Sequence, residues 1–254
     1  MDRTEPRLTT SVERGVATVV ITNPAKRNAM TAPMWRSVPK LLERLAADPA
    51  VRVLVLTGAG DTFCAGADIS TLRESPATAQ GLAVAAEEAL AAFPRPTLAA
   101  VRGYCVGGGS QLAAACDLRF AEEGARFGVT PAKLGIVYPA SSTRRLATLV
   151  GPATAKHLLF SGELIDAERA LRTGLADEVL PAGGLDRRVE EYTRVLASRS
   201  LLTQAAAKEF AAGRTDRDAH WAGEARGSGD TAEGVAAFLE RRAPRFTYPA
   251  GPAG

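Results

Sequence analysis

Apolar runs alternate along the first half of the chain with segments whose apolar positions recur every three or four residues. The β-branched run 15–24 ends in Asn-Pro and predicts a strand followed by a turn. Further strands are predicted at 51–58, 97–103 and 117–121. Helices are predicted at 32–48 and near 77–92. Strands that alternate with helices indicate an α/β fold with largely parallel strand pairing.

Local signals refine this pattern. Pro39 lies inside the first predicted helix and is expected to kink it. Residues 61–70 predict a loop, and three glycines at 107–109 lead into a short helix that ends at Cys116. After about residue 140 the pattern becomes mainly helical. The helix predicted at 230–244 opens with Asp230 and Glu233, the spacing of a capping box.

Length and composition narrow the class of protein. A chain of 254 residues with 46% hydrophobic and 23% charged residues can bury a sizeable core. The formal net charge of +3 is too small to indicate a nucleic-acid partner, and the basic residues are scattered. No apolar run reaches the ~18 residues needed to span a bilayer. We therefore expect a soluble protein with no nucleic-acid or membrane partner.

Cysteine and histidine usage excludes most metal and redox chemistry. The cysteines are Cys64, Cys105 and Cys116, an odd number without a C-x-x-C pair. They are expected to be small buried residues in a reducing, cytoplasmic environment. There are two histidines, His157 and His220, and no ligand-like spacing surrounds either. No metal site is expected.

The glycine run does not match the common phosphate-binding or nucleophile motifs. A dinucleotide fingerprint starting at Gly107 and a nucleophile elbow both fail because Leu112 stands at the last glycine position. Free N–H groups at a helix start attract negative charge, and a missing Cβ lets a carbonyl approach closely. The run therefore predicts either an oxyanion hole or a turn built only for tight packing, and both interpretations remain open at this point.

Five stretches together carry a family resemblance: "NPAKRNAM" (23–30), "FCAGADI" (63–69), "RGYCVGGGSQLAAACDLRFA" (102–121), "RFGVTPAKLGIVY" (126–138) and "EGVAAFLERRAPRF" (233–246). In their order and spacing the chain resembles the crotonase superfamily, that is, the enoyl-CoA hydratase/isomerase family. The resemblance implies an α/β crotonase spiral of repeated ββα units over residues 1–195. It also implies a C-terminal helical region, 196–254, that makes homotrimers or dimers of trimers.

The same resemblance implies an acyl-CoA thioester substrate, with coenzyme A as part of the substrate and no other cofactor. Backbone N–H groups of Ala67 and Gly108 would hold the thioester oxygen and stabilise an enolate. Residues near the two motifs would contact the CoA portion: Lys26, Arg27, Ala65, Asp68 and Ile69. Lys26 and Arg27 could equally be solvated surface charges, and Asp68 could equally cap the next helix.

Two positions depart from the hydratase pattern. Family hydratases carry a glutamate three residues after the middle glycine, where this chain has Gln111, and a second one where it has Pro131. An amide does not titrate near neutral pH, and proline has neither acid nor base. Simple water addition is therefore not expected. Isomerisation would need another proton shuttle, such as Tyr138, an acid from residues 70–92, or a neighbouring subunit.

"TPAKLGIVY" also resembles the methylmalonyl-CoA decarboxylase branch, which implies that Thr130 and Tyr138 hold a substrate carboxylate. That branch has a histidine where Ala67 stands and an acid at the position of Gln111. Local backbone bonding of Thr130 and core packing of Tyr138 are the competing interpretations. A non-catalytic acyl-CoA binder is the alternative from another class.

Overall fold

The computed structural model describes residues 5–69 and 76–248. The strands in these residues are β1 (Arg7–Glu13), β2 (Val16–Thr22), β3 (Val53–Gly58), β4 (Thr97–Val101), β5 (Tyr104–Val106), β6 (Leu118–Glu122), β7 (Arg126–Gly128), β8 (Ile165–Asp166) and β9 (Glu178–Leu180). The α-helices are α1 (Ala32–Ala47), α3 (Pro76–Ala91), α4 (Gly108–Ala115), α5 (Ala140–Ser161), α6 (Ala167–Thr173), α7 (Leu185–Ala197), α8 (Leu201–Ala211), α9 (Asp218–Ser228) and α10 (Asp230–Leu239). Short 3₁₀ turns are η1 (Pro24–Lys26), η2 (Pro131–Leu134) and η3 (Thr215–Arg217).

The strands form two separate sheets. The larger sheet has the order β1-β2-β3-β4-β6-β9, and every pair after β1–β2 is parallel. The smaller sheet has the order β5-β7-β8, with β5 and β7 parallel. The predicted α/β class with largely parallel pairing is confirmed.

Successive chain segments repeat one unit. β4 lies in the large sheet, β5 in the small one, and α4 follows; β6, β7 and α5 repeat this order. A parallel bridge between Cys64 and Cys105 brings the segment after β3 beside β5 in the same way. This stepping from one sheet to the other is the expected spiral of ββα units. It stacks the loops that follow each unit along one edge of the molecule.

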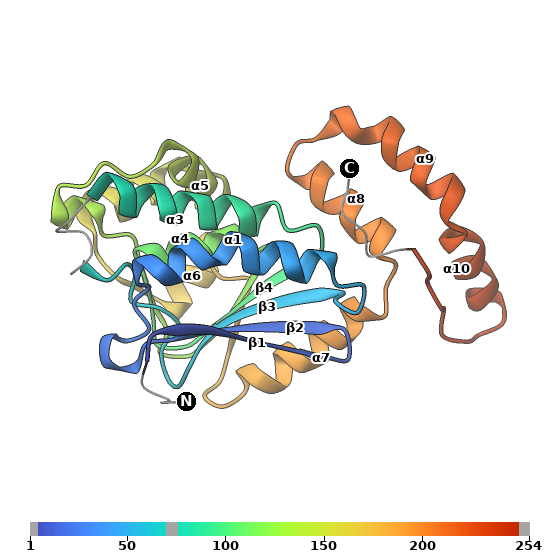
Figure 1. Cartoon of the computed structure of the whole chain (residues 1–254), viewed down its shortest axis with the longest axis horizontal. Coiled ribbons are helices and arrows are strands. Elements are labelled where there is room, and N and C mark those ends of the chain that lie inside the picture. Colours follow the sequence, from blue (N-terminus) through green and yellow to red (C-terminus); the bar gives the residue numbers. More distant parts are fainter. Residues whose placement is uncertain (1–4, 70–75, 249–254) are drawn as a thin grey trace.

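The large sheet is covered on both faces. Figure 1 shows α1 and α3 along one face and α7 along the opposite one. Side chains of β3 alternate accordingly: Leu54 and Leu56 join the core under α1 and α3, and Val55 joins the smaller core with Leu185 of α7. Burial on both faces explains the unbroken apolar run at 53–56 within this strand.

Three local predictions need correction. The strand β1 was not predicted, because most of its residues are exposed and its pattern lacks an apolar face. Pro39 does not interrupt α1, which continues from Ala32 to Ala47. The capping box is wrong: Gly229 is the N-cap of α10, and the Asp230 carboxylate instead accepts from Ser200 Oγ at 2.6 Å.

The last helices, α8 to α10, lie beside the layered body (Figure 1). One contact between these helices and the layered body is the ion pair from Lys208 Nζ of α8 to Asp117 Oδ2, at 2.9 Å. Exposed apolar side chains remain on α10: Val235, Phe238 and Leu239.

The predicted division between residues 195 and 196 falls in the last turn of α7, because that helix ends at Ala197. The two-part organisation therefore stays a prediction. Within the described parts of the chain, no helix has the length and apolar character that crossing a bilayer requires.

Candidate active site

The loop 23–30 is held by its two asparagines. Asn28 has a left-handed backbone, with φ of 59°, which asparagine tolerates better than most residues. Its side chain accepts from Asn23 N at 3.0 Å and donates to Ala59 O at 2.9 Å and Thr62 O at 2.6 Å. The loop after β2 is therefore fastened to the loop after β3, which explains the Asn-rich motif "NPAKRNAM".

The backbone pairing between Met30 and the 66–68 segment leaves the N–H of Ala67 without an acceptor among the described residues. Met30 N donates to Gly66 O at 2.8 Å, and Asp68 N donates to Met30 O at 2.9 Å. In such a parallel bridge the residue between the two bonded peptides, Ala67, points its own N–H to the opposite side. Across the described residues, no acceptor binds the Ala67 N–H.

The glycine run supplies a second free N–H beside the first. Gly107 has φ of 55° and donates to Gly128 O at 2.8 Å, and its own carbonyl accepts the first helical bond, from Gln111 N. Gly108 therefore starts α4 with an N–H that has no acceptor within the helix. A Cβ on Gly108 would stand 3.5 Å from Ala67 N, and one on Gly66 would stand 3.5 Å from Gly108 N.

Close packing fixes these glycines in place. A Cβ on Gly109 would lie 2.3 Å from Cys64 O, so no larger residue fits there without moving the loop. The tight-packing interpretation of the glycine run is thus correct for Gly109. It does not exclude the oxyanion interpretation, because the same contact presses the 64–67 loop against the start of α4. The arrangement can offer two main-chain donors to one oxygen.

The indole of Trp35 forms a wall of this space. Its Cζ2 would be 2.8 Å from a Cβ on Gly108. The side chain is 2% exposed, and its Nε1 has no acceptor in the described part of the chain. No sequence pattern marks this contact, because α1 and α4 are far apart in the chain.

The residues expected to contact CoA lie on the two loops that carry Ala67 and its bridge partner Met30. Lys26 Nζ binds both oxygens of Asp68, at 2.9 and 2.7 Å, and remains half exposed. The Arg27 guanidinium stacks over the Tyr104 ring, 4.9 Å from its centroid. Ile69 is 59% exposed. Ala65 is fixed by its N–H to Arg27 O at 3.0 Å.

Gln111 lies one turn into α4 and takes part in a buried polar cluster. Its Nε2 donates to Glu87 Oε2 at 2.6 Å and to Ser142 Oγ at 3.1 Å. Ser142 also donates to Glu87, and Arg145 forms an ion pair with the other Glu87 oxygen. The cluster joins α3, α4 and α5. Glu87 is 1% exposed, so a buried carboxylate does lie beside Gln111, although it belongs to another helix.

Thr130, on the loop that follows β7, lies close to the glycine run. Its Oγ1 is 3.8 Å from a Cβ placed on Gly107. Pro131 begins η2 directly after it, so no carboxylate occupies the position of the second hydratase glutamate. Tyr138 packs against the main core; burial, and after it the negative charge of Glu87, raises the pKa of its hydroxyl. It stays protonated at neutral pH.

All three cysteines are buried, as expected. Burial raises the pKa of the Cys64 thiol to about 12, which argues against a nucleophilic role despite its place close to Ala67. In the described residues no group of three His, Cys, Asp or Glu side chains is arranged to hold a metal ion.

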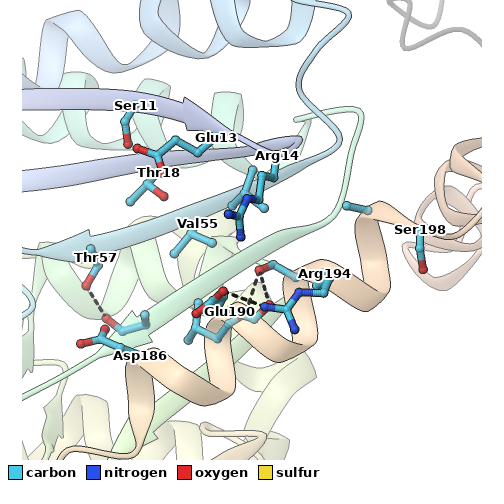
Figure 2. A pocket seen from close by; sticks show the side chains of 15 residues that line it. Ser11, Glu13, Arg14, Thr18, Val55, Thr57, Asp186, Glu190, Arg194 and Ser198 are labelled. Atoms are coloured by element: carbon cyan, nitrogen blue, oxygen red, sulfur yellow. Dashed lines mark hydrogen bonds and ion pairs between the residues drawn. The ribbon is translucent and has the colours of Figure 1, made fainter.

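A groove of about 700 Å³ lies elsewhere, between the large sheet and α7 (Figure 2). Asp186, Glu190 and Arg194 border it from α7. Two ion pairs lie at its border: Arg194 pairs with Glu190 at 2.7 Å, and Asp186 pairs with Arg102 at 2.5 Å. None of the residues expected to bind acyl-CoA lines this groove. It lies on the sheet face opposite α1 and α3 and is separate from the candidate site.

Sequence reasoning allowed for an acid from residues 70–92, the range in which Glu87 lies, but did not single out Glu87, Ser142 or Arg145. One signal for Glu87 was present: it shares a stripe of α3 with the buried residues Ala83, Ala86 and Leu90. A charged residue on an apolar helix face must find partners in the core. No comparable pattern marks Ser142 or Arg145, because their roles depend on how α5 packs against α3 and α4.

Comparison with known proteins agrees with this geometry. A family model described as Enoyl-CoA hydratase/isomerase matches residues 11–249. The chain is 34% identical over 254 residues to (E)-benzylidenesuccinyl-CoA hydratase from Thauera aromatica, covering 94% of this chain and 98% of the relative. It is 35% identical over 249 residues to crotonyl-CoA hydratase from Syntrophomonas wolfei, covering 92% and 95%. The crystal structure of an enoyl-CoA hydratase/isomerase family member superposes with a TM-score of 0.90 at 39% identity and covers 98% of both chains. The chain belongs to the enoyl-CoA hydratase/isomerase family of the crotonase superfamily.

Proposed function

We propose that this protein converts an acyl-CoA thioester through an enolate held by the N–H groups of Ala67 and Gly108. The observation that carries the proposal is the pair of unbonded main-chain donors on neighbouring loops. Negative charge develops on the thioester oxygen as an enolate forms, and each fixed donor aimed at it is worth ~3 kcal/mol of barrier. The hydratases among the relatives support an acyl-CoA substrate.

The side chains around this pair argue against ordinary water addition. Gln111 cannot take a proton from water, and Pro131 offers no acid. The buried Glu87 is engaged by Arg145, Ser142 and Gln111. We therefore propose that the enolate arises by a route other than direct hydration, with isomerisation of a 3-enoyl thioester as the first candidate.

Decarboxylation of a malonyl-type thioester is the second candidate. Loss of CO2 leaves the enolate directly, so no base has to remove a carbon-bound proton. The position of Thr130 beside Gly107 favours it, since a hydroxyl there could hold a carboxylate near the donors. Tyr138, protonated at neutral pH, could supply a second hydroxyl.

One assay separates the candidates. The pure protein is incubated with crotonyl-CoA, a 3-enoyl-CoA and methylmalonyl-CoA, and each thioester is followed by mass spectrometry. We expect conversion of the second or third and slow hydration of the first. Rapid hydration of crotonyl-CoA would contradict the roles given to Gln111 and Pro131. Tight binding of all three without conversion would identify an acyl-CoA binder.

Replacing Lys26 by glutamine is expected to raise KM for an acyl-CoA about fivefold while kcat stays unchanged. Lys26 Nζ binds Asp68, but the side chain is half exposed, so the ammonium can also pair with a CoA phosphate, and a partly exposed pair is worth ~1 kcal/mol. Steady-state kinetics with the acyl-CoA and with its pantetheine analogue measure the effect. The pantetheine thioester, which lacks those phosphates, should show no change. Lys40→Gln, an exposed lysine on α1, is the control.

We also propose that α10 contributes to a homotrimer or a dimer of trimers. Phe238 is 83% exposed and Leu239 is 74% exposed, which is unusual for side chains of this size. Phe238→Asp is expected to reduce the mass in sedimentation velocity from that of the oligomer to that of one chain. Thr231→Asp adds the same charge at an exposed position of the same helix and should leave the mass unchanged. A wild-type protein that sediments as a monomer would contradict the proposal.

A further inference from the structure

The start of α1 contacts both of the loops that carry the proposed donors. Met30, just before the helix, pairs with Ala67 in a parallel bridge and so fixes the direction of the first N–H. Thr31 follows as the N-cap of the helix, and its carbonyl accepts from Trp35 N at 3.0 Å. Trp35 is therefore held by the helix one turn after the residue that orients Ala67.

The Trp35 side chain reaches the second donor. A Cβ on Gly108 would stand 2.8 Å from Cζ2 and 3.1 Å from Cη2 of the indole, so the ring edge fills the space beside the Gly108 backbone. The next residue packs against the other loop, because a Cβ on Gly109 would lie 2.3 Å from Cys64 O. The first turn of α4 is thus packed against two surfaces, and close packing of this kind resists small shifts.

An indole is a costly side chain for this place. Trp35 is 2% exposed, and its Nε1 is a sealed donor without an acceptor in the described part of the chain. A buried donor without a partner lowers stability, so a fully apolar side chain would suit an ordinary core position better. Cζ2 and Cη2 are among the indole atoms farthest from the backbone, and a phenylalanine ring ends short of them. The indole supplies reach to Gly108, and broken local rules of this kind are expected at functional sites.

We propose that Trp35 is a positioning residue that holds the Gly108 N–H in line with the oxygen of a bound thioester. This inference rests on the proposed acyl-CoA function, and it applies equally to isomerisation and decarboxylation because both pass through the same enolate. The indole acts through its contact with Gly108 and not through a bond to the substrate. Hydrogen bonds depend steeply on distance and direction, and a misplacement of about 1 Å can cost about 10²-fold in rate.

The infrared spectrum of a bound thioester tests this without turnover. Butyryl-CoA labelled with carbon-13 at its carbonyl has no double bond to move and no carboxylate to lose. Hydrogen bonds to the carbonyl oxygen lower its stretching frequency. We expect the wild-type protein to lower this frequency, and Trp35→Phe to lose about half of that shift, since one of two donors is displaced.

The kinetics of Trp35→Phe should show a matching split. We expect kcat to fall about 10- to 100-fold on whichever thioester the wild-type protein converts. Affinity for butyryl-CoA should change by less than about twofold, because the donors act mainly on charge that develops in the transition state. A merely structural role would instead lower the free energy of unfolding in urea and leave the carbonyl frequency of the folded protein unchanged.

Three further variants make the test decisive. Trp221→Phe is the matched control: Trp221 is also buried, but it lies in α9, where its Nε1 donates to Glu209 at 2.7 Å. It should keep the carbonyl shift and kcat. Trp35→Leu also removes the ring edge and serves if Trp35→Phe does not fold. Trp35→benzothienylalanine keeps the shape of the indole with sulfur in place of N–H, so it should keep the wild-type shift.

The outcomes separate this inference from the function beneath it. If butyryl-CoA does not bind, or if its carbonyl frequency is unchanged in the wild-type protein, the proposed function fails and this inference fails with it. If Trp35→Phe or Trp35→Leu keeps the full shift, or if Trp221→Phe loses it equally, only the role of Trp35 is overturned. Loss of the shift in Trp35→benzothienylalanine would assign the effect to the indole N–H and would also overturn the proposal.

Discussion

Replacing Gly108 by alanine is expected to lower kcat about 10²- to 10³-fold on whichever thioester the wild-type protein converts. The new methyl group would stand 2.8 Å from Trp35 Cζ2 and 3.5 Å from Ala67 N. It would push the start of α4 away from the indole and would crowd the approach to the second donor. Steady-state kinetics and acyl-CoA titration measure the two effects, and we expect kcat to fall more than affinity.

The control for this change is Gly81→Ala. Gly81 is an exposed glycine of α3 where a Cβ would meet nothing within 4 Å, so kcat should be unaffected. Combining Gly108→Ala with Trp35→Phe removes the indole contact but leaves the methyl group beside Ala67 N. We expect this double variant to remain slow. Wild-type kcat in Gly108→Ala would rule out the two-donor site.

Replacing Asn28 by alanine is expected to lower the free energy of unfolding by about 3–4 kcal/mol. Its side chain makes hydrogen bonds to Asn23 N, Ala59 O and Thr62 O, each worth ~1 kcal/mol. Alanine at φ of 59° adds a cost of ~1 kcal/mol. Urea unfolding followed by circular dichroism measures the change.

Asn28→Gly separates the two causes. Glycine adopts the left-handed conformation without cost but makes none of the side-chain hydrogen bonds. We expect it to be about 1 kcal/mol less damaging than alanine. Equal loss in both variants would mean that the hydrogen bonds alone hold the loop, and a loss below about 1 kcal/mol in both would contradict the fastening role of Asn28. Activity should fall in either variant, because the loop holds Gly66 and Ala67.

The sequence was sufficient for β2, β3, β4 and β6, the inner strands of the large sheet, but not for the short strands of the small sheet. The apolar run at 53–56 predicted a buried parallel strand because both faces of the large sheet are covered. The glycine run stood out through its glycines, whereas the "AGAD" loop was recognised through the family resemblance. By contrast β1 lies at a sheet edge, so its residues carry little pattern.

Contacts between distant helices could not be predicted. Glu87, Gln111 and Ser142 come from three helices, and their meeting depends on how those helices pack. The prediction for Asp230 failed for the same reason. Its spacing from Glu233 suited a capping box, but its carboxylate accepts from Ser200, the N-cap of α8, and from the backbone N–H groups of Thr247 and Tyr248 after α10. A buried carboxylate needs several hydrogen-bond donors, and donors from distant parts of the chain can outweigh a local capping pattern.

The two donors proposed for the thioester are peptide N–H groups, and this affects how the gene can vary. A codon change at position 67 or 108 removes the N–H itself only if it encodes proline, although at position 108 any added side chain also displaces the donor through contact with Trp35. The chemistry carried by side chains, at Gln111 and Pro131, can be changed by single codons without touching those donors. Random mutagenesis of this chain should therefore change reaction type more readily than it abolishes thioester recognition, provided that Asn28 and the close-packed glycines Gly108 and Gly109 are left intact.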